Sequence, residues 1–261
     1  MIGVFDSGIG GLTVVRALSR LLPGYDLVYF GDTARTPYGT KSPETVTGYS
    51  LEITRFLLSK GAKIIVIACN TASSVAFENI KNAYDLPVFE VITPAVDLSI
   101  ENSKDFKIGI IGTWATVTSG TYEKKIRNIK PGAKVYSRAC PLLVPLVEEG
   151  WLNKPETAMI VKKYLYPLKV RQIDTLILGC THYPLLKKLI HKKIGKKVYI
   201  IDSSIAVADE VKRFLDKHPE IDNLIGKRGV AKFFVSDVTE QFKKTAMGTL
   251  GKNILLEQAK I

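Results

Sequence analysis

The sequence predicts an α/β fold with mainly parallel sheets, arranged as two related halves. Short apolar segments alternate with segments of helical periodicity along the chain, which is the pattern of parallel sheets covered by helices. An internal echo indicates the two halves. Residues 64–71 and 176–181 share one order, in which an apolar strand and a small residue precede Cys, and Thr and a helix follow. We therefore expect Cys69 and Cys180 at equivalent strand ends.

The first half alternates four strands with three helices. Apolar segments predict strands over residues 2–5, 27–30, 63–68 and 87–91. The third of these is apolar on both faces, which is typical of a strand buried within a parallel sheet. Helical spacing predicts helices over residues 10–22, 42–60 and 73–84. Ser42 and Pro43 form the start signal of the second helix, and Gly61 is its stop.

The same alternation restarts at residue 107. Strands are predicted over residues 107–111, 133–137, 175–178, 198–201 and 230–235. Helices are predicted over residues 117–127, 142–149, 155–170, 183–193, 204–216 and 238–248.

Composition indicates a globular protein from a reducing compartment. Of the 261 residues, 46% are hydrophobic, which excludes a disordered or collagen-like chain. Three cysteines are too few, and odd in number, for a disulfide framework. The N-terminus has no basic flank before an apolar stretch, and no segment approaches the roughly 18 apolar residues of a membrane helix. We expect a cytoplasmic protein with no membrane partner.

The formal net charge of +12 allows a nucleic-acid partner, an anionic membrane surface or an acidic small molecule. The lysines are scattered as pairs, and their densest stretch, residues 187–197, interleaves them with apolar residues as on the outer side of an amphipathic helix. We favour a solvated lysine-rich surface and expect no nucleic-acid partner. A basic nucleic-acid-binding protein remains the rival class, and the paired cysteine loops argue against it.

Polar loops follow four of the predicted strands. Ligands of open α/β sheets lie at the carboxyl ends of strands, so these loops are the candidate site. Their residues are 6–11, 32–39, 69–73 and 180–184. The first loop carries three glycines before a helix, which suits either an anion cradle or a tight turn. It lacks the P-loop lysine, and Thr13 replaces the third glycine of a dinucleotide fingerprint.

The two cysteine loops offer thiols, hydroxyls, an amide and an imidazole. A thiol near a helix N-terminus has a lowered pKa and becomes a base or nucleophile, so we expect this of both cysteines. We expect no metal, since no Cys-x-x-Cys occurs and only His182 lies near a cysteine. A redox disulfide between Cys69 and Cys180 is an open alternative that nothing in the sequence selects.

Together these loops resemble the signatures of the glutamate racemase family, within the aspartate/glutamate racemases. The matching segments, in order, are Asp6-Ser7-Gly8-Ile9-Gly10-Gly11-Leu12-Thr13, Gly31-Asp32-Thr33-Ala34-Arg35-Thr36-Pro37-Tyr38-Gly39, Ala68-Cys69-Asn70-Thr71-Ala72-Ser73 and Leu178-Gly179-Cys180-Thr181-His182-Tyr183-Pro184-Leu185-Leu186. The order, the spacing and the total length also fit, so the resemblance covers essentially the whole chain.

The resemblance implies cofactor-independent interconversion of L- and D-glutamate, which supplies D-glutamate for bacterial peptidoglycan and the cell wall. It implies two α/β domains with the active site in the cleft between them. By the family's pattern Cys69 and Cys180 are the catalytic acid–base pair, on opposite faces of the substrate Cα. Asp6 is expected to assist Cys69, and His182 to assist Cys180. Glu148 is a further expected acid, although Glu149 beside it leaves that assignment open.

Substrate contacts are also implied by the resemblance. The expected residues supply hydroxyls, amides, backbone N–H groups and a carboxylate, and they are Asp6, Ser7, Pro37, Tyr38, Gly39, Asn70, Thr71, Thr181 and His182. Simpler interpretations exist for some of them, because Pro37 and Tyr38 also suit a turn and His182 also suits a structural imidazole. Cys140, just after a predicted strand, is interpreted as a small core residue.

We place the first domain at residues 1–92 plus 208–261 and the second at residues 93–207. The expected partner is the small molecule glutamate. Members of the family often form dimers, so the resemblance also allows a homodimer. The rival within enzymes is an aspartate racemase. Aspartate racemases usually carry an acid where this chain has His182, so the Cys-Thr-His triplet favours glutamate.

Overall fold

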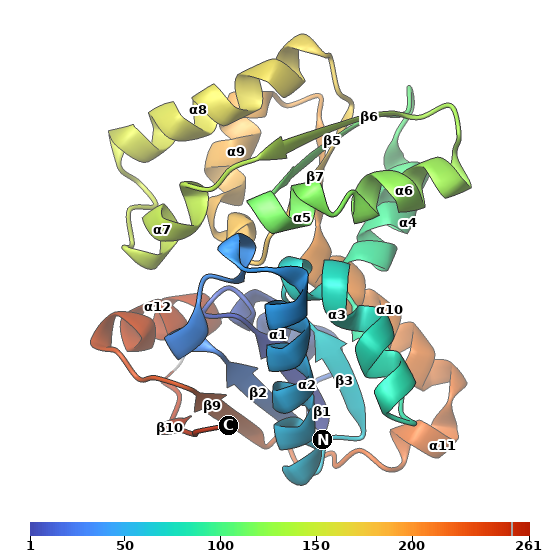
Figure 1. The fold of residues 1–261 in the computed structure, drawn as a ribbon, viewed down its shortest axis with the longest axis vertical. Coiled ribbons are helices and arrows are strands. Elements are labelled where there is room, and N and C mark those ends of the chain that lie inside the picture. Colours follow the sequence, from blue (N-terminus) through green and yellow to red (C-terminus); the bar gives the residue numbers. More distant parts are fainter. Residues whose placement is uncertain (252) are drawn as a thin grey trace.

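The computed structural model describes residues 1–251 and 253–261, and its described strands form two parallel sheets, one below the other in Figure 1. The first sheet has the order β10-β9-β2-β1-β3-β4 and the second the order β6-β5-β7-β8. The strands of the first sheet are β1 (Ile2–Asp6), β2 (Leu27–Gly31), β3 (Ile64–Ile67), β4 (Val88–Glu90), β9 (Ala231–Val235) and β10 (Leu256–Gln258). Those of the second are β5 (Lys107–Gly112), β6 (Lys134–Ala139), β7 (Thr175–Gly179) and β8 (Tyr199–Asp202). The predicted α/β class with parallel sheets is confirmed.

Helices cover both faces of each sheet, so that apolar residues lie on both sides of the central strands. The first sheet packs between α2 and α3 on one face and α1, α10 and α12 on the other. The second packs between α7, α8 and α9 on one face and α4 and α6 on the other. The helices are α1 (Leu12–Leu21), α2 (Pro43–Ser59), α3 (Asn70–Ala83), α4 (Ile92–Asn102), α5 (Trp114–Thr118), α6 (Thr121–Ile129), α7 (Leu143–Glu148), α8 (Pro155–Val170), α9 (Lys187–Ile194), α10 (Ser203–Lys217), α11 (Pro219–Asp222) and α12 (Glu240–Leu250).

The two sheets repeat one strand order. The sequence β2-β1-β3-β4 in the first sheet corresponds to β6-β5-β7-β8 in the second. In each, the winding direction reverses between the two central strands, β1 and β3 or β5 and β7. Such reversals open a crevice at the carboxyl ends of the strands, where ligands of open α/β sheets bind. Because β3 and β7 occupy equivalent places, the residues that follow them are equivalent too.

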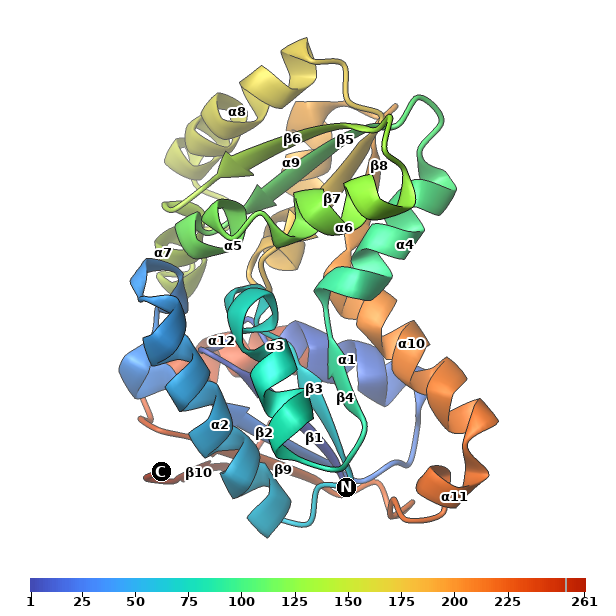
Figure 2. The same cartoon turned by 45° about the vertical axis from the view of Figure 1, so that its right-hand side comes forward.

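Two helices, α4 and α10, connect the layers and pack against each other (Figure 2). Within α10, Ala206 belongs to the core of the second sheet, whereas Val207, Ala208 and Val211 belong to the core of the first. The division at residues 92/93 and 207/208 therefore meets the first turn of α4 and the second turn of α10. That division remains a prediction, and residue 252 of its final segment lies outside the described residues.

The predicted helix over residues 117–127 is wrong in its extent. Two helices, α5 and α6, occupy this region, and Gly120 separates them with a left-handed φ of +64°. The predicted helix over residues 183–193 begins as a 3₁₀ turn, Tyr183–Leu186, before α9. The 11-residue helix α4 and two short elements, α11 and β10, escaped prediction.

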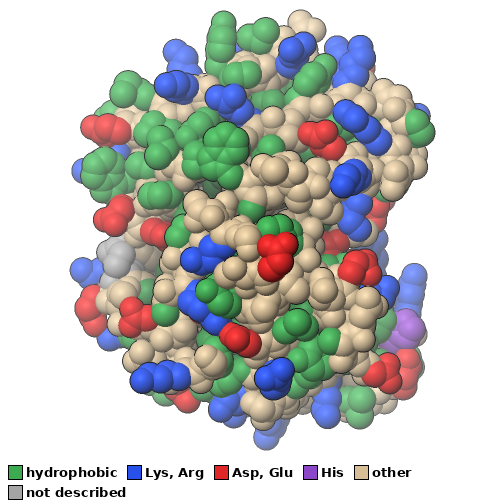
Figure 3. All heavy atoms as spheres, viewed as in Figure 1, with side chains coloured by type: hydrophobic (Ala, Val, Ile, Leu, Met, Phe, Trp, Pro, Cys, Tyr) green, Lys and Arg blue, Asp and Glu red, His purple; other side chains and the backbone are tan. Residues whose placement is uncertain are grey.

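Lysine and arginine side chains are spread over the face seen in Figure 3, with acidic side chains between them. Hydrophobic side chains gather instead in the upper part of that view. Among the helices that the structure describes, none combines the length and apolar character needed to cross a bilayer.

Candidate active site

A narrow cavity lies between the two sheets, at the carboxyl ends of β1, β3 and β7. Most residues that line it come from the loops after these strands and from the loop after β2. The other two are Thr113, which follows β5, and Val144 on α7. The lining residues are Ser7, Thr36, Pro37, Tyr38, Gly39, Cys69, Asn70, Thr71, Thr113, Val144, Cys180, Thr181 and His182. Both echoed cysteines therefore face one cavity, each from the equivalent strand end of its own sheet.

Cys69 follows β3 and precedes the first residue of α3. It is buried, and its Sγ donates a hydrogen bond of 3.8 Å to Ser7 Oγ. Burial and the nearby charge of Asp6 raise the pKa of the Cys69 thiol to about 12. The predicted lowering of its pKa is therefore wrong for this arrangement, because the backbone N–H of Ala72 at the helix start does not offset burial. At neutral pH Cys69 is a thiol that can donate a proton.

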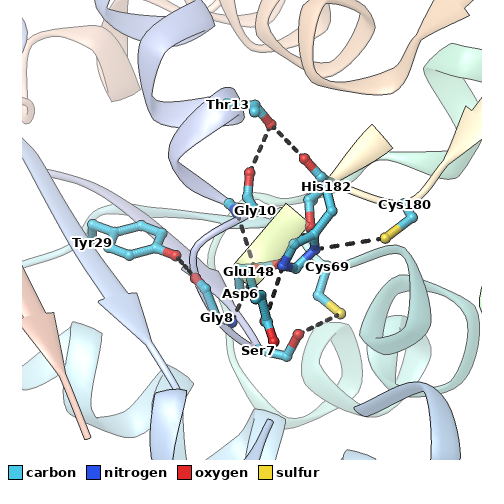
Figure 4. A network of polar contacts seen from close by, with 12 residues as sticks. Asp6, Ser7, Gly8, Gly10, Thr13, Tyr29, Cys69, Glu148, Cys180 and His182 are labelled. Atoms are coloured by element: carbon cyan, nitrogen blue, oxygen red, sulfur yellow. Dashed lines mark hydrogen bonds and ion pairs between the residues drawn. The ribbon is translucent and has the colours of Figure 1, made fainter. Parts of the chain in front are cut away.

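Cys180 follows β7 and has an imidazole as its neighbour (Figure 4). His182 Nδ1 lies 3.7 Å from Cys180 Sγ, and His182 Nε2 lies 3.2 Å from Glu148 Oε1. Burial lowers the pKa of His182, but the contacts with Cys180 and Glu148 outweigh burial and raise it to about 10. The Glu148–His182–Cys180 line thus places a protonated imidazole beside the second thiol at neutral pH.

Asp6 ends β1 and is fully buried. Its carboxylate accepts 3.0 Å hydrogen bonds from the backbone N–H groups of Gly8 and Gly11, and a 3.1 Å bond from Thr181 Oγ1. The glycine turn therefore does form an anion cradle, but the anion that it holds is the carboxylate of Asp6 itself. Burial raises the pKa of Asp6, opposed by His182 and by these hydrogen bonds.

Asp6, which is expected from the sequence to assist Cys69, lies near this thiol without a hydrogen bond to it. In the part of the chain that the structure describes, Asp6 and Cys69 share no hydrogen bond, and Ser7 is the hydrogen-bond partner of the thiol. Asp6 acts on Cys69 through its charge, which raises the thiol's pKa. It acts on the other cysteine loop directly, through Thr181.

Within the described part of the chain, two buried polar atoms from cavity-lining residues have no hydrogen-bond partner. They are the Asn70 Nδ2 amide and the Thr36 Oγ1 hydroxyl. The other end of the Asn70 amide is fixed, because its Oδ1 accepts a 2.7 Å hydrogen bond from Tyr122 OH on α6. Buried donors without partners are costly, so a carboxylate in the cavity would satisfy a need that the protein leaves open.

Three lining residues escaped the sequence prediction, namely Thr36, Thr113 and Val144. Thr113 forms a hydroxyl triangle with Thr71 and Thr116, with Oγ1–Oγ1 distances of 3.0 to 3.3 Å, and so joins α3 to α5 across the cavity. The sequence could have indicated Thr113, because this polar residue closely follows the strand predicted over residues 107–111. Thr36 lies within the polar loop of residues 32–39, whereas Val144 carried no signal because an apolar residue on a helix is typical of a core position.

The structure brings nearly all of the predicted site residues together. Asp6 and Glu148 do not line the cavity, but each contacts a residue that does. Glu148 rather than Glu149 reaches His182, and the side chain of Glu149 is exposed. Tyr38 lines the cavity while its hydroxyl donates to Asp32 Oδ2. Cys140 is fully buried in the core of the second sheet, as interpreted from the sequence.

Comparison with known proteins decides the family. The family model described as Asp/Glu/hydantoin racemase matches residues 2–211. The chain belongs to this family. A glutamate racemase of Persephonella marina is 46% identical to it, over the whole chain and 97% of the relative. The prediction of an amino-acid racemase, which is an isomerase, is confirmed by such relatives.

Solved structures of this racemase family share the fold. A glutamate racemase isoform of Bacillus anthracis is 38% identical, with a TM-score of 0.94 over 100% of this chain and 97% of that one. A glutamate racemase of Francisella tularensis, solved in complex with D-glutamate, is 38% identical, with a TM-score of 0.90 over 99% and 97% of the two chains.

Proposed function

We propose that the protein racemises glutamate without a cofactor, using Cys69 and Cys180 as the two acid–base groups. The observation that carries the proposal is the placement of two buried thiols on one cavity, from equivalent strand ends of two sheets. Each thiol has its own polar partner, Ser7 for Cys69 and His182 for Cys180. The many relatives named glutamate racemase, one of them solved with D-glutamate, support glutamate as the substrate.

Racemisation at a carbon atom requires two groups. A single base that returned its proton to the side from which it came would restore the starting enantiomer. In the proposed reaction the thiolate of Cys180 removes the α-proton, and the thiol of Cys69 then delivers its own proton to the opposite face. Cys69 is left as the thiolate and Cys180 as the thiol, so the reverse reaction starts from that state and consumes the other enantiomer.

The proposed helpers differ between the two thiols. Protonated His182, held by Glu148, supplies the positive partner that activates a cysteine base. Asp6 keeps Cys69 in the proton-donating form, because its charge and the burial of the site raise the pKa of the thiol. The proposed exchange requires the two cysteines to begin in opposite protonation states, with Cys69 as the thiol and Cys180 as the thiolate.

The proposed substrate contacts come from the first sheet's loops together with Thr181 and His182. All of them line the cavity except Asp6, which lies behind the lining and accepts a hydrogen bond from Thr181. The residues are Asp6, Ser7, Pro37, Tyr38, Gly39, Asn70, Thr71, Thr181 and His182. Asn70 Nδ2, a donor with no partner among the residues that the structure describes, suits a substrate carboxylate. Donors placed in a dry cavity also stabilise the negative charge that develops when Cα loses its proton. We propose that the D-glutamate formed enters peptidoglycan synthesis.

The test is to offer each glutamate enantiomer to the purified, reduced protein in D₂O. Circular dichroism follows racemisation and mass spectrometry follows deuterium at Cα. We expect both enantiomers to lose optical activity and to gain one deuterium. Folded protein that exchanges neither enantiomer would refute the proposal. Aspartate enantiomers in the same assay test the rival substrate, and faster turnover of aspartate than of glutamate would overturn the substrate assignment.

A further inference from the structure

The side-chain amide of Asn70 has different surroundings at its two ends. Asn70 is the first residue of α3, is 2% exposed and lines the active-site cavity. Its Oδ1 accepts a 2.7 Å hydrogen bond from Tyr122 OH. Its Nδ2 has no hydrogen-bond partner among the residues that the structure describes. The amide therefore keeps its donor end for a ligand in the cavity.

The hydroxyl of Tyr122 decides which end of the amide is kept for the ligand. An amide oxygen and an amide nitrogen are nearly equal in size, so packing alone does not separate the two orientations of Asn70. Tyr122 OH has one hydrogen to donate, and Asn70 Oδ1 is its only acceptor within the described part of the chain. If the amide turned round, this buried hydrogen would lose its acceptor, and an oxygen would replace the donor on the cavity side.

The surroundings of Tyr122 hold its hydroxyl in place as a donor. The residue is 2% exposed, and its ring belongs to the apolar core between α4, α6 and the second sheet. Burial and the nearby charge of Glu90 raise the pKa of the hydroxyl well above its usual range, so it stays protonated at neutral and alkaline pH. Thr121, the preceding residue of α6, donates a 3.3 Å hydrogen bond to the backbone oxygen of Ser74 on α3. Two contacts from one turn of α6 therefore fix it against α3.

We propose that Tyr122 is a positioning residue for substrate binding, which holds the Asn70 amide with its N–H group toward a carboxylate of the substrate. This role rests on the proposed function, because the carboxylate is that of glutamate. Tyr122 is not among the residues that line the cavity, so it acts through Asn70. Tyr122 lies on α6 of the upper layer and Asn70 on α3 of the lower layer (Figure 2). The carboxylate donor is therefore oriented only when the two layers meet.

Steady-state racemisation by Tyr122→Phe tests this role, since the variant removes the hydroxyl and keeps the buried ring. We expect KM for both glutamate enantiomers to rise about tenfold and kcat to fall less than about threefold, because binding of the carboxylate is weakened throughout the reaction. Tyr25→Phe is the matched control, because it removes a hydroxyl that donates a 2.6 Å hydrogen bond to Asp222 outside the cavity, and its KM should be unchanged. An inactive wild type would refute the proposed function and this role with it. An active wild type with unchanged KM in Tyr122→Phe would overturn the role of Tyr122 alone.

A double-mutant cycle separates positioning from a general effect on packing. Asn70→Ala removes the amide, and we expect KM to rise about tenfold or more. In that background Tyr122→Phe should change KM less than about twofold, because no amide remains to be oriented. Additive effects on KM would contradict the proposal.

Asn70→Asp tests the same contact from the side of the amide. This variant keeps an acceptor for Tyr122 OH but places an oxygen where the donor was. We expect KM to rise more than in Asn70→Ala, because two carboxylates then face each other. An equal or smaller rise would show that the donor end does not face the substrate carboxylate, and would overturn the proposal.

Discussion

At the scale of single residues, the two thiols occupy contrasting surroundings. Cys69 lies among neutral hydroxyls and the carboxylate of Asp6, which together with burial raise its pKa to about 12. Cys180 lies beside His182, whose pKa is raised to about 10. This contrast divides the proposed roles between proton donor and base.

Glu148 is a positioning residue in this account, since it acts through His182 and not on substrate. Glu148→Gln removes a charge that raises the pKa of His182. We expect kcat to fall by about tenfold or more, and the alkaline limb of the pH profile of kcat/KM to move to lower pH. Glu149→Gln is the matched control, because that neighbour is exposed, and we expect nearly unchanged kinetics from it. A larger effect from the control would transfer the role to Glu149.

The pKa of His182 also predicts how stability depends on pH. The pKa of an unfolded histidine is about 6.5. Because the folded value is raised to about 10, the native state holds its proton more tightly. The stabilisation is fully present below about pH 6.5 and is lost as pH rises toward 10.

Urea unfolding of the wild type and of His182→Gln between pH 6 and pH 9.5 measures this contribution. The difference in free energy of unfolding should shrink with rising pH by up to about 1.4 kcal/mol per unit. A difference that stayed constant or grew with pH would show that His182 is not the protonated partner described above.

The chemistry of single site residues was largely open to prediction, but their surroundings were not. Residue type and position after a predicted strand were enough to select Cys69, Cys180 and His182 as candidates. The direction of the Cys69 pKa shift depends on burial and on Asp6, which lies 63 positions away in the sequence and meets Cys69 only through the sheet. The choice of Glu148 over Glu149 depends on the orientation of α7, which the sequence alone does not supply.

At the scale of elements, the glycine turn after β1 fits closely against the Cys180 loop. A Cβ on Gly10 would lie 2.3 Å from Thr181 Oγ1 and 2.7 Å from His182 Nδ1. We expect Gly10→Ala to fold and to displace this loop, with a fall in kcat/KM of about 100-fold. Gly48→Ala is the control, because that glycine is exposed within α2 with no atom near its added Cβ.

The control variant has its own expected result. Alanine in the helix interior should raise the free energy of unfolding by about 1 kcal/mol and leave turnover unchanged. Steady-state kinetics and thermal unfolding of both variants measure these effects. Normal activity in Gly10→Ala would show that the Cys180 loop tolerates displacement and does not depend on this contact.

Most elements could be predicted because their periodicity and end signals agree. Residues 63–68 and the Ser42-Pro43 start of α2 are examples in which local preference and fold coincide. The prediction of one helix over residues 117–127 missed the break at Gly120, although glycine is a common helix stop. The left-handed φ of +64° at this residue separates α5 from α6. The sequence gives only a weak start signal for α4, because Val91 at its N-cap has no capping side chain and Pro94 is the third residue of the helix.

At the scale of the whole molecule, the repeated strand order is what makes a two-base site feasible. Equivalent ends of β3 and β7 face each other across the cavity, so each sheet presents one cysteine to it. Hydrogen bonds across the layers hold this arrangement, among them Tyr122 to Asn70 and Thr181 to Asp6. The sequence predicted the repeat from the cysteine echo, but these pairings between distant residues required the structure.

The most direct test of the two-thiol account is the α-proton exchange of single cysteine variants in D₂O. Cys69→Ser and Cys180→Ser should each lose racemisation by at least about 100-fold. Each should retain, at most, exchange with one enantiomer, and the two variants should favour opposite enantiomers. Cys140→Ser, with the same substitution in the core, should keep turnover. Near-wild-type racemisation by either site variant, or the same enantiomer preference in both, would contradict the account.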